Sequence, residues 1–338
     1  MLNLFRTLIR IHFFLVLLLC CTNCTAQNNR NKMSDNPMLC NPDTGLCEMP
    51  AKNPAVGLDA AAEPVGQTKP IQIVYFTDPI CSSCWGIEPQ LRRLKLEYGE
   101  YLHIDYRMGG LLPDWSYNSG GISKPSDVAG HWDEVSHHYD MPIDGDVWLE
   151  DPLPSSYPPS IAFKAAQMQD ELRAIAFLRR IREMVFLEKK NITRWEHLQK
   201  AAEETGLDAA LMKTAMEGPA LQAFQKDLDL ARSMGVRGFP TLFFSDAAGN
   251  RLTLYGARPY AQFEQNLKAL LPDASGKPFD TRPEALFARY PTLTNREFAT
   301  LSGKPKAEAE QQLSDLFEAK KLRKTVTKNG VLWIWAKN

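Results

Sequence analysis

The chain has 338 residues, of which 44% are hydrophobic, and this is enough for two compact units with substantial cores. Its 39 basic and 40 acidic residues give a net charge of −1. This balance excludes a general electrostatic attraction to nucleic acids or to anionic membrane surfaces.

The segment 1–26 has the pattern of a signal peptide. Arg6 and Arg10 precede an apolar stretch over 11–21, and small and polar residues follow it. The apolar stretch is shorter than the about 20 residues that a membrane-spanning helix needs. We therefore expect a signal-like leader over 1–26 and a protein of the periplasm or cell envelope. The alternatives are an uncleaved anchor and a cytoplasmic protein whose translation starts internally at Met33.

Residues 27–69 are polar, alanine-rich and dotted with prolines, which predicts a flexible linker. The linker contains Cys40 and Cys47, and three of the other five cysteines belong to the leader. Asn41-Pro42-Asp43 and Gly45 favour a tight turn that would bring Cys40 and Cys47 together. These two residues are interpreted either as an auxiliary redox pair that exchanges with a second dithiol, or as a structural disulfide or idle thiols.

A second cysteine pair follows the first predicted strand. The β-rich run 71–77 leads through Asp78-Pro79 to Cys81-Ser82-Ser83-Cys84, which opens a helix predicted over 84–98. Free N–H groups at a helix start stabilise a thiolate and can lower a cysteine pKa from ~8.5 into the range ~3.5–7.5. No cation lies between the two cysteines, so we expect only a moderately lowered pKa for Cys81. We interpret Cys81 as the exposed nucleophile and Cys84 as the buried resolving thiol.

Several neighbouring residues have two interpretations each. A CxxC motif can be half of a zinc site, but no second CxxC or CxxH follows it, so no metal is predicted. Asp78 either caps the turn or handles protons. Trp85 either contacts a substrate or packs against the sheet.

A helical region is predicted after the strand at 102–107 and the glycine-rich segment at Gly109-Gly110. It forms an insertion over about 113–218, with helices at 125–140, 158–168, 170–188, 193–205 and 207–216. The spacing of the histidines and acids around His131 spreads them over more than one helix face. This spacing does not favour a metal site.

The last part of the domain begins with a helix at 219–234, which leads into Gly238-Phe239-Pro240-Thr241. Strands at 241–245 and 251–255 and a helix at 260–271 follow. A CxxC after the first strand and a Gly-x-Pro before a late strand resemble the thioredoxin superfamily. The separation between Cys81 and Pro240 is far too long for plain thioredoxin and fits the DsbA-like branch of the superfamily.

This resemblance implies an α/β protein, with a thioredoxin-like fold and an inserted helical domain over 70–272. It also implies that Pro240 is cis and faces the dithiol, and that Phe239 shapes the edge where substrates dock. The stretches Cys81–Pro89, Leu94–Gly99 and Met108–Leu111 look like the YjbH-type branch of DsbA-like proteins. Some members of that branch are adaptors that deliver the Spx regulator to a protease.

The segment 282–338 is predicted to be a small C-terminal module. Three helices and a hairpin resemble a winged helix, with helices at 283–289, 295–301 and 306–320 and strands at 322–327 and 331–335. Its eleven basic and six acidic residues give it a net charge of +5. However, the helix that would enter a DNA groove carries four acids, Glu308, Glu310, Asp315 and Glu318. We therefore predict no specific nucleic-acid binding, and expect packing or a protein client.

The leading functional interpretation is a thiol–disulfide oxidoreductase that needs no cofactor. It would exchange disulfides with protein thiols through Cys81 and Cys84. The alternative is a non-catalytic adaptor or redox-sensing protein that binds a client for proteolysis. The C-terminal module favours this alternative, because a simple oxidase does not need it.

Overall fold

The structure, a computed structural model, describes residues 40–41, 44–48, 69–116 and 124–336. The leader predicted over 1–26 and most of the predicted linker lie outside these residues. In the part of the chain that is described, no helix is both long and apolar enough to cross a membrane.

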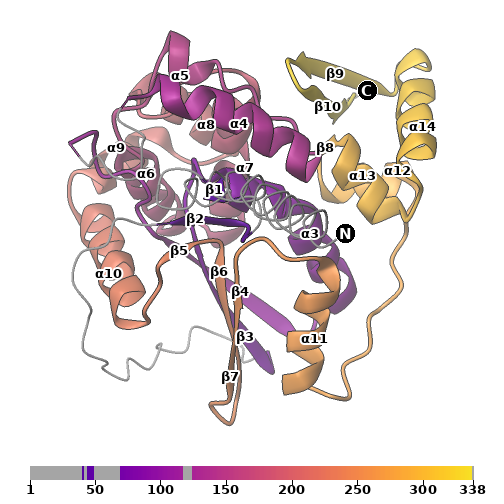
Figure 1. The fold of residues 1–338 in the computed structure, drawn as a ribbon, viewed down its shortest axis with the longest axis horizontal. Helices are drawn as coiled ribbons and strands as arrows, with labels where there is room; N and C mark the ends of the chain where they lie inside the picture. Colours follow the sequence, from indigo (N-terminus) through magenta and orange to yellow (C-terminus); the bar gives the residue numbers. More distant parts are fainter. Residues whose placement is uncertain (1–39, 42–43, 49–68, 117–123, 337–338) are drawn as a thin grey trace, which may run out of the picture. The chain divides into compact units, whose positions relative to one another are not determined.

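A four-stranded sheet forms the centre of the thioredoxin-like domain (Figure 1). Its strands in spatial order are β4 (Leu102–Met108), β3 (Ile71–Thr77), β6 (Thr241–Asp246) and β7 (Arg251–Tyr255). β3 runs parallel to β4 and antiparallel to β6. All residues of β3 except Gln72 are buried, as expected for a central strand that is covered on both faces. The predicted α/β thioredoxin-like fold is confirmed.

The helix predicted over 84–98 is two helices in the structure. α2 (Ser82–Gly86) ends before Ile87, and α3 (Glu88–Tyr98) begins directly after it. Pro89 lies in the first turn of α3, where its missing N–H costs nothing. The short α2 therefore carries Ser82, Ser83 and Cys84 as a separate turn on top of the longer helix.

Helices fill the chain between β4 and β6. They are α4 (Ser126–Tyr139), α5 (Val147–Glu150), α6 (Tyr157–Gln167), α7 (Glu171–Leu187), α8 (Trp195–Glu204), α9 (Ala209–Met216) and α10 (Pro219–Ser233). The sequence did not predict α5, which is a single short turn. α7 is buried along much of its length, and it packs against α6 and α8.

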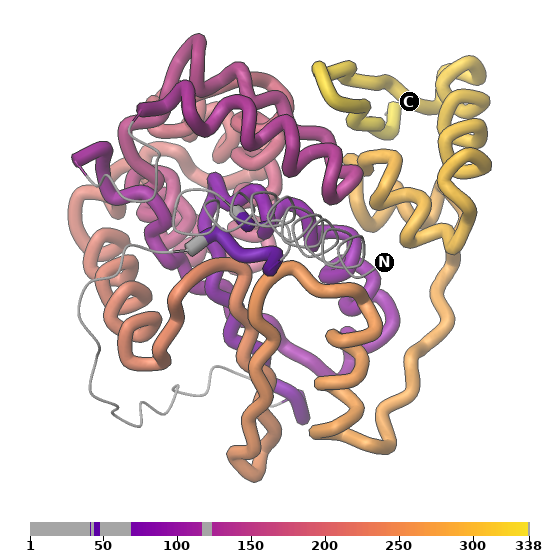
Figure 2. Tube along the Cα trace, in the orientation of Figure 1, coloured from indigo at the N-terminus to yellow at the C-terminus, as the bar shows by residue number. Residues whose placement is uncertain are grey.

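Part of the segment predicted as a linker is a small hairpin. β1 (Cys40–Asn41) pairs with β2 (Leu46–Glu48), and β2 pairs with β5 (Gly238–Phe239), so the three form a second sheet. Figure 2 shows this indigo segment beside the orange strands at the end of the domain. The linker prediction is therefore wrong for residues 44–48. These residues form a strand by pairing with β5, which lies far away in the chain, and the local sequence does not indicate such a pairing.

The C-terminal module has a core of its own. Its elements are α12 (Pro283–Arg289), β8 (Thr292–Thr294), α13 (Asn295–Ser302), α14 (Lys306–Glu318), β9 (Leu322–Thr327) and β10 (Gly330–Trp335). The predicted helices and hairpin are present, whereas β8 was not predicted; the sheet order is β8–β10–β9. The likeness to a winged helix stays a prediction.

A buried carboxylate joins the C-terminal module to the rest of the molecule. Glu297 of α13 is completely buried and accepts two hydrogen bonds from Arg179 of α7, at 2.8 and 3.0 Å. Arg92 of α3 lies 3.2 Å from the same carboxylate. At the hairpin between β9 and β10, Asn329 donates to Asp133 at 2.8 Å. The module is thus packed on the thioredoxin-like domain and its insertion, as one of the two expected outcomes had it.

Candidate functional site

The two cysteines of the CxxC motif lie at the start of α2. Cys81 is the N-cap residue, and the backbone N–H of Cys84 donates to the Cys81 sulfur at 3.1 Å. Both residues are free thiols. This is the helix-start geometry that the sequence predicted, and it stabilises negative charge on the sulfur.

The Cys81 thiol is covered by another cysteine. The Sγ atoms of Cys81 and Cys47 are 3.3 Å apart, and Cys47 is itself disulfide-bonded. Cys40 is the Cα partner of Cys47 in the β1–β2 ladder, and its side chain lies outside the described residues. Cys81, Cys84 and Cys47 are all 0% exposed. The prediction that Cys81 is an exposed nucleophile is therefore wrong in this state, because β2 lies over it.

A buried cation that the sequence analysis missed stands beside the dithiol. Arg182 of α7 is 0% exposed and donates to Thr77 Oγ1 at 2.6 Å and to Glu88 Oε1 at 2.7 Å. It also donates to the backbone oxygen of Asp78 at 3.2 Å. The sequence analysis expected only the N–H groups of the helix start to stabilise a thiolate. This is wrong, because the charge of Arg182 also acts on both sulfurs. One signal was available, namely an arginine among the apolar residues of the helix predicted over 170–188.

The pKa values of the two thiols move in opposite directions. Complete burial raises the pKa of Cys81 well above its ordinary value, which contradicts the moderate lowering expected from its helix-start position. Burial also acts to raise the pKa of Cys84, but the hydrogen bond with Cys81 and the charge of Arg182 outweigh it and lower that pKa. In the covered state, negative charge on the pair is therefore favoured on Cys84.

Asp78 ties the turn before the dithiol to the glycine-rich segment. One oxygen accepts from the N–H of Ile80 at 3.0 Å, which confirms the turn-cap interpretation. The other accepts from the N–H of Leu111 and from the Ser156 hydroxyl, both at 2.8 Å. Burial raises the pKa of Asp78 to about 6, although these hydrogen bonds and the charge of Arg182 oppose the rise.

The raised pKa of Asp78 predicts a stability change between about pH 4 and pH 7. The folded state holds this proton more tightly than the unfolded state, so ionisation of Asp78 costs folding free energy as the pH rises through about 6. The shift corresponds to about 3 kcal/mol. We expect Asp78→Asn to become more stable relative to the wild type by about this amount between pH 4 and pH 7. Urea unfolding across that range measures it, and parallel curves for the two proteins would contradict it.

The strand-entry proline has the predicted cis peptide bond. The Phe239–Pro240 peptide bond is cis, and the Pro240 carbonyl oxygen accepts from the N–H of Gly256 at 2.9 Å. The Phe239 ring is buried against Gly109, where an added Cβ atom would lie 1.8 Å from the ring. The backbone edge of Phe239, which the resemblance assigns to substrate docking, is paired with Cys47.

Trp85 packs inside the protein. It is 0% exposed, its Nε1 donates to the Pro142 carbonyl oxygen at 3.0 Å, and its ring stacks on Phe186. The guanidinium carbon of Arg179 lies 4.3 Å from the ring centroid. These contacts favour the packing interpretation of Trp85 over the predicted contact with substrate.

No metal centre is visible in the described residues, where no group of three or more His, Cys, Asp or Glu side chains could hold a metal ion. His131 is buried on α4, with one ring nitrogen 4.0 Å from Glu134. The acids and histidines of this helix therefore do not converge.

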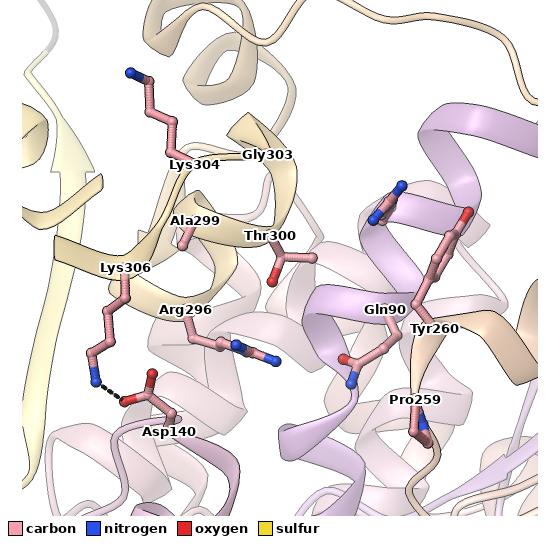
Figure 3. A pocket seen from close by; sticks show the side chains of 11 residues that line it. Gln90, Asp140, Pro259, Tyr260, Arg296, Ala299, Thr300, Gly303, Lys304 and Lys306 are labelled. Carbon is pink, nitrogen blue, oxygen red and sulfur yellow. Dashed lines mark hydrogen bonds and ion pairs between the residues drawn. The ribbon is translucent and has the colours of Figure 1, made fainter. Parts of the chain in front are cut away.

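A cleft of about 360 Å³ is lined by residues of α3 and the start of α11 (Tyr260–Leu270) on one side and of α13 and the start of α14 on the other (Figure 3). Of its basic side chains, Lys306 is paired with Asp140 and Arg93 with Glu97. Arg296 is exposed and extends into the cleft toward Gln90. Within the described part of the chain, no hydrogen bond or ion pair neutralises its charge.

Comparison with known proteins places the chain among thioredoxin-like proteins. A family model described as thioredoxin matches residues 75–265. A relative from Halalkalibacterium halodurans named ClpXP adapter protein SpxH is 33% identical over 305 residues, covering 88% of this chain and 97% of its own. The Bacillus subtilis protein of the same name is 32% identical over 271 residues, covering 78% of this chain and 89% of its own.

One solved structure supports the fold. A candidate protein disulfide isomerase from Nitrosomonas europaea superposes with a TM-score of 0.52 and 20% identity. The match covers 60% of this chain and 98% of that protein. At this identity, the likeness concerns the fold alone.

Proposed function

This chain belongs to the thioredoxin family and to the same group as the relatives named ClpXP adapter protein SpxH, and on that premise we propose that it is an adaptor. It binds a protein client and presents it to a ClpXP-type protease. Of the two functions predicted from the sequence, we therefore favour the adaptor over the thiol–disulfide oxidoreductase.

The extent of the likeness carries the proposal. The thioredoxin model covers 75–265, whereas the adaptor relative covers 88% of this chain. The match with the adaptor therefore extends well beyond the thioredoxin-like domain. The burial of both thiols points the same way, because a covered dithiol is poorly placed for continuous turnover of disulfides.

The cleft beside the C-terminal module is our candidate for client binding. Arg296 extends into it without a partner among the described residues, so an acidic client segment would complement it. Lys304 also borders the cleft but points away from it in Figure 3. Arg296 can therefore be tested by substitution, with Lys304 as the control residue at the border of the same cleft.

The adaptor proposal predicts client turnover that depends on this protein. Proteins that accumulate both in a strain lacking this gene and in a strain lacking ClpX are the candidate clients. With such a client and purified ClpXP, we expect degradation to be about tenfold faster or more when the wild-type protein is added than when it is left out. A tenfold change corresponds to about 1.4 kcal/mol of added binding free energy between client and protease. The Cys81→Ser/Cys84→Ser variant and Lys304→Glu should keep this activity, and Arg296→Glu should lose most of it. The absence of any shared client would contradict the proposal.

The second candidate function is thiol–disulfide exchange with protein substrates. Two observations favour it: Cys81 and Cys84 are free thiols close to the charge of Arg182, and the Phe239–Pro240 bond is cis. Reduction of insulin that is abolished by Cys81→Ser would support it. If insulin reduction is found but no client is degraded, the enzyme reading replaces the adaptor reading.

The two functions differ in the compartment they call for. An adaptor has to share the compartment of its protease, which fits translation from Met33 and a cytoplasmic protein. Export through the leader fits the oxidoreductase. Sequencing the N-terminus of the protein purified from its own host separates these proposals.

A further inference from the structure

The docking edge before Pro240 is occupied by a segment of the same chain. β2 pairs antiparallel with β5, with Cys47 opposite Phe239 and Glu48 opposite Gly238. Extended peptides bind exposed sheet edges in this way, adding one strand through main-chain hydrogen bonds. Cys47 therefore stands where the cysteine of a bound peptide would stand.

The sulfur atoms are placed for reaction. The distance of 3.3 Å between Cys47 Sγ and Cys81 Sγ lies within the ~3–3.5 Å at which reacting atoms are positioned for attack. Cys47 is disulfide-bonded, whereas Cys81 and Cys84 are free thiols. One sulfur is thus an electrophile and its neighbour a nucleophile, which are the two components of thiol–disulfide exchange.

The hairpin is held by a close fit of backbone on backbone. The N–H of Ala257 donates to the Gly45 carbonyl oxygen at 2.7 Å. A Cβ atom at Gly45 would lie 2.5 Å from the Ala257 nitrogen, and one at Gly256 would lie 2.2 Å from the Thr44 oxygen. Glycines on both sides of this contact are required for the approach, so the covered position is specified by the sequence.

We propose that the hairpin formed by β1 and β2 is an internal disulfide substrate of Cys81 and Cys84 and a reversible cover of the docking edge. As part of this proposal we assign the second cysteine of that disulfide to Cys40, because Cys40 is the Cα partner of Cys47 in the ladder. Directly opposed residues in an antiparallel pair have Cα atoms about 4.5–5.5 Å apart, within the range that a disulfide spans.

The exchange balances within the chain. The exchange starts with Cys84 as the thiolate and Cys81 as the thiol. Cys84 takes the proton of Cys81, and Cys81 attacks Cys47 Sγ, so that a Cys47–Cys81 bond forms and the Cys40–Cys47 bond breaks. The released Cys40 thiolate takes up the proton from Cys84. Cys84 then attacks Cys81, a Cys81–Cys84 disulfide forms, and Cys47 leaves as a thiolate. Two electrons have moved from the Cys81/Cys84 pair to the Cys40/Cys47 pair, with no external reagent.

The reduced hairpin has lost the bond that closes its turn, and it leaves the edge of β5. The docking edge is then open to an extended segment of a partner. This proposal does not depend on the adaptor function, because exchange and opening are both measured without a client. If the adaptor test fails, the internal disulfide exchange can still be correct. If the exchange is not found, the adaptor test is unaffected.

A trapped intermediate tests the exchange. In the full chain with Cys20, Cys21 and Cys24 replaced by serine, Cys84→Ser removes the resolving thiol. Peptide mapping after acid quenching, without reductant, should recover Cys47 linked to Cys81 within one chain as the main species. Adding Cys47→Ser should abolish that link. A free Cys81 in Cys84→Ser, or a link only between two chains, would overturn the proposal.

Access to Cys81 tests the cover. We expect Gly45→Ala to raise the rate of Cys81 alkylation by iodoacetamide about tenfold or more, because the added Cβ meets the Ala257 backbone and favours the open hairpin. Gly249→Ala is the matched control, since Gly249 has a similarly positive φ but nothing within 4 Å of an added Cβ. Its alkylation rate should equal that of the wild type. Equal rates for all three proteins would show that the hairpin does not cover Cys81.

Discussion

Replacing Arg182 with methionine is expected to lower the free energy of unfolding by about 3–5 kcal/mol. The arginine is 0% exposed, and its guanidinium bonds Thr77, Glu88 and the Asp78 carbonyl. Methionine fills part of the space but leaves these acceptors without their donor. Urea unfolding followed by tryptophan fluorescence measures the change. Arg173→Met, at an exposed position of the same helix, loses one hydrogen bond to the Gly206 carbonyl oxygen and should change stability by about 1 kcal/mol or less.

The same variant should weaken the thiolate. The charge of Arg182 lowers the pKa of both Cys81 and Cys84, so its removal raises both. Thiolate absorbance during a pH titration of the reduced protein reports this. A double variant that also carries Glu88→Gln should recover part of the stability, because Arg182→Met leaves the Glu88 carboxylate with only the more distant Arg92, at 3.9 Å. It should recover none of the thiolate shift. If the titration is unchanged in Arg182→Met, the arginine is structural only.

Replacing Glu297 with alanine is expected to cost about 3–5 kcal/mol and to loosen the C-terminal module. The substitution leaves Arg179 and Arg92 buried without their shared carboxylate. It also removes the bond from the Thr294 N–H to the Glu297 side chain, which caps α13. We expect hydrogen exchange in α13 and α14 to accelerate more than exchange in β3.

Two control variants separate the loss of the Glu297 charge from the loss of any exposed acid. Glu297→Gln keeps the size of the side chain and an acceptor for Thr294, so its cost should be smaller than that of Glu297→Ala. Glu318→Ala, on the exposed end of α14, should change stability by about 0.5 kcal/mol or less. Burial acts to raise the pKa of Glu297, but the two arginines outweigh it and lower that pKa. The stabilisation from Glu297 is therefore present above the ordinary pKa of 4.5 and is lost as the pH falls through the lowered value. Uniform acceleration of exchange throughout the protein would argue against a local role.

The parts of the site that depend on local sequence were predictable. The positions of Cys81 and Cys84 at a helix start follow from a strand, a turn and a helix that are adjacent in the chain. The cis bond before Pro240 followed from the family resemblance and not from the residues alone. The apolar neighbours of Arg182 in the predicted helix could indicate that it is buried. They could not place it beside the dithiol, because nothing local shows that α7 packs against a turn that lies far earlier in the chain.

Long-range pairing explains the other differences. The hairpin at 44–48 has few apolar residues and exists through contacts with Phe239 and Ala257, so its sequence is that of a linker. β8 is a very short strand and is stabilised by β10, from which it is separated in the chain by α13, α14 and β9. The motif Thr294-Asn295-Arg296-Glu297 was a readable capping box, whereas the arginines that meet its acid come from two distant helices.

The three-way contact of Glu297 has a consequence for the newly made chain. Arg179 is separated from Glu297 by 118 positions. At about 5–20 residues per second, the ribosome needs about 6–24 s to add the missing carboxylate. During that interval Arg92 and Arg179 lack the Glu297 carboxylate that both contact in the finished chain. A chain that stops short of α13 therefore displays a charged, partly apolar surface that a finished chain hides, and a chaperone or protease could distinguish the two by that surface.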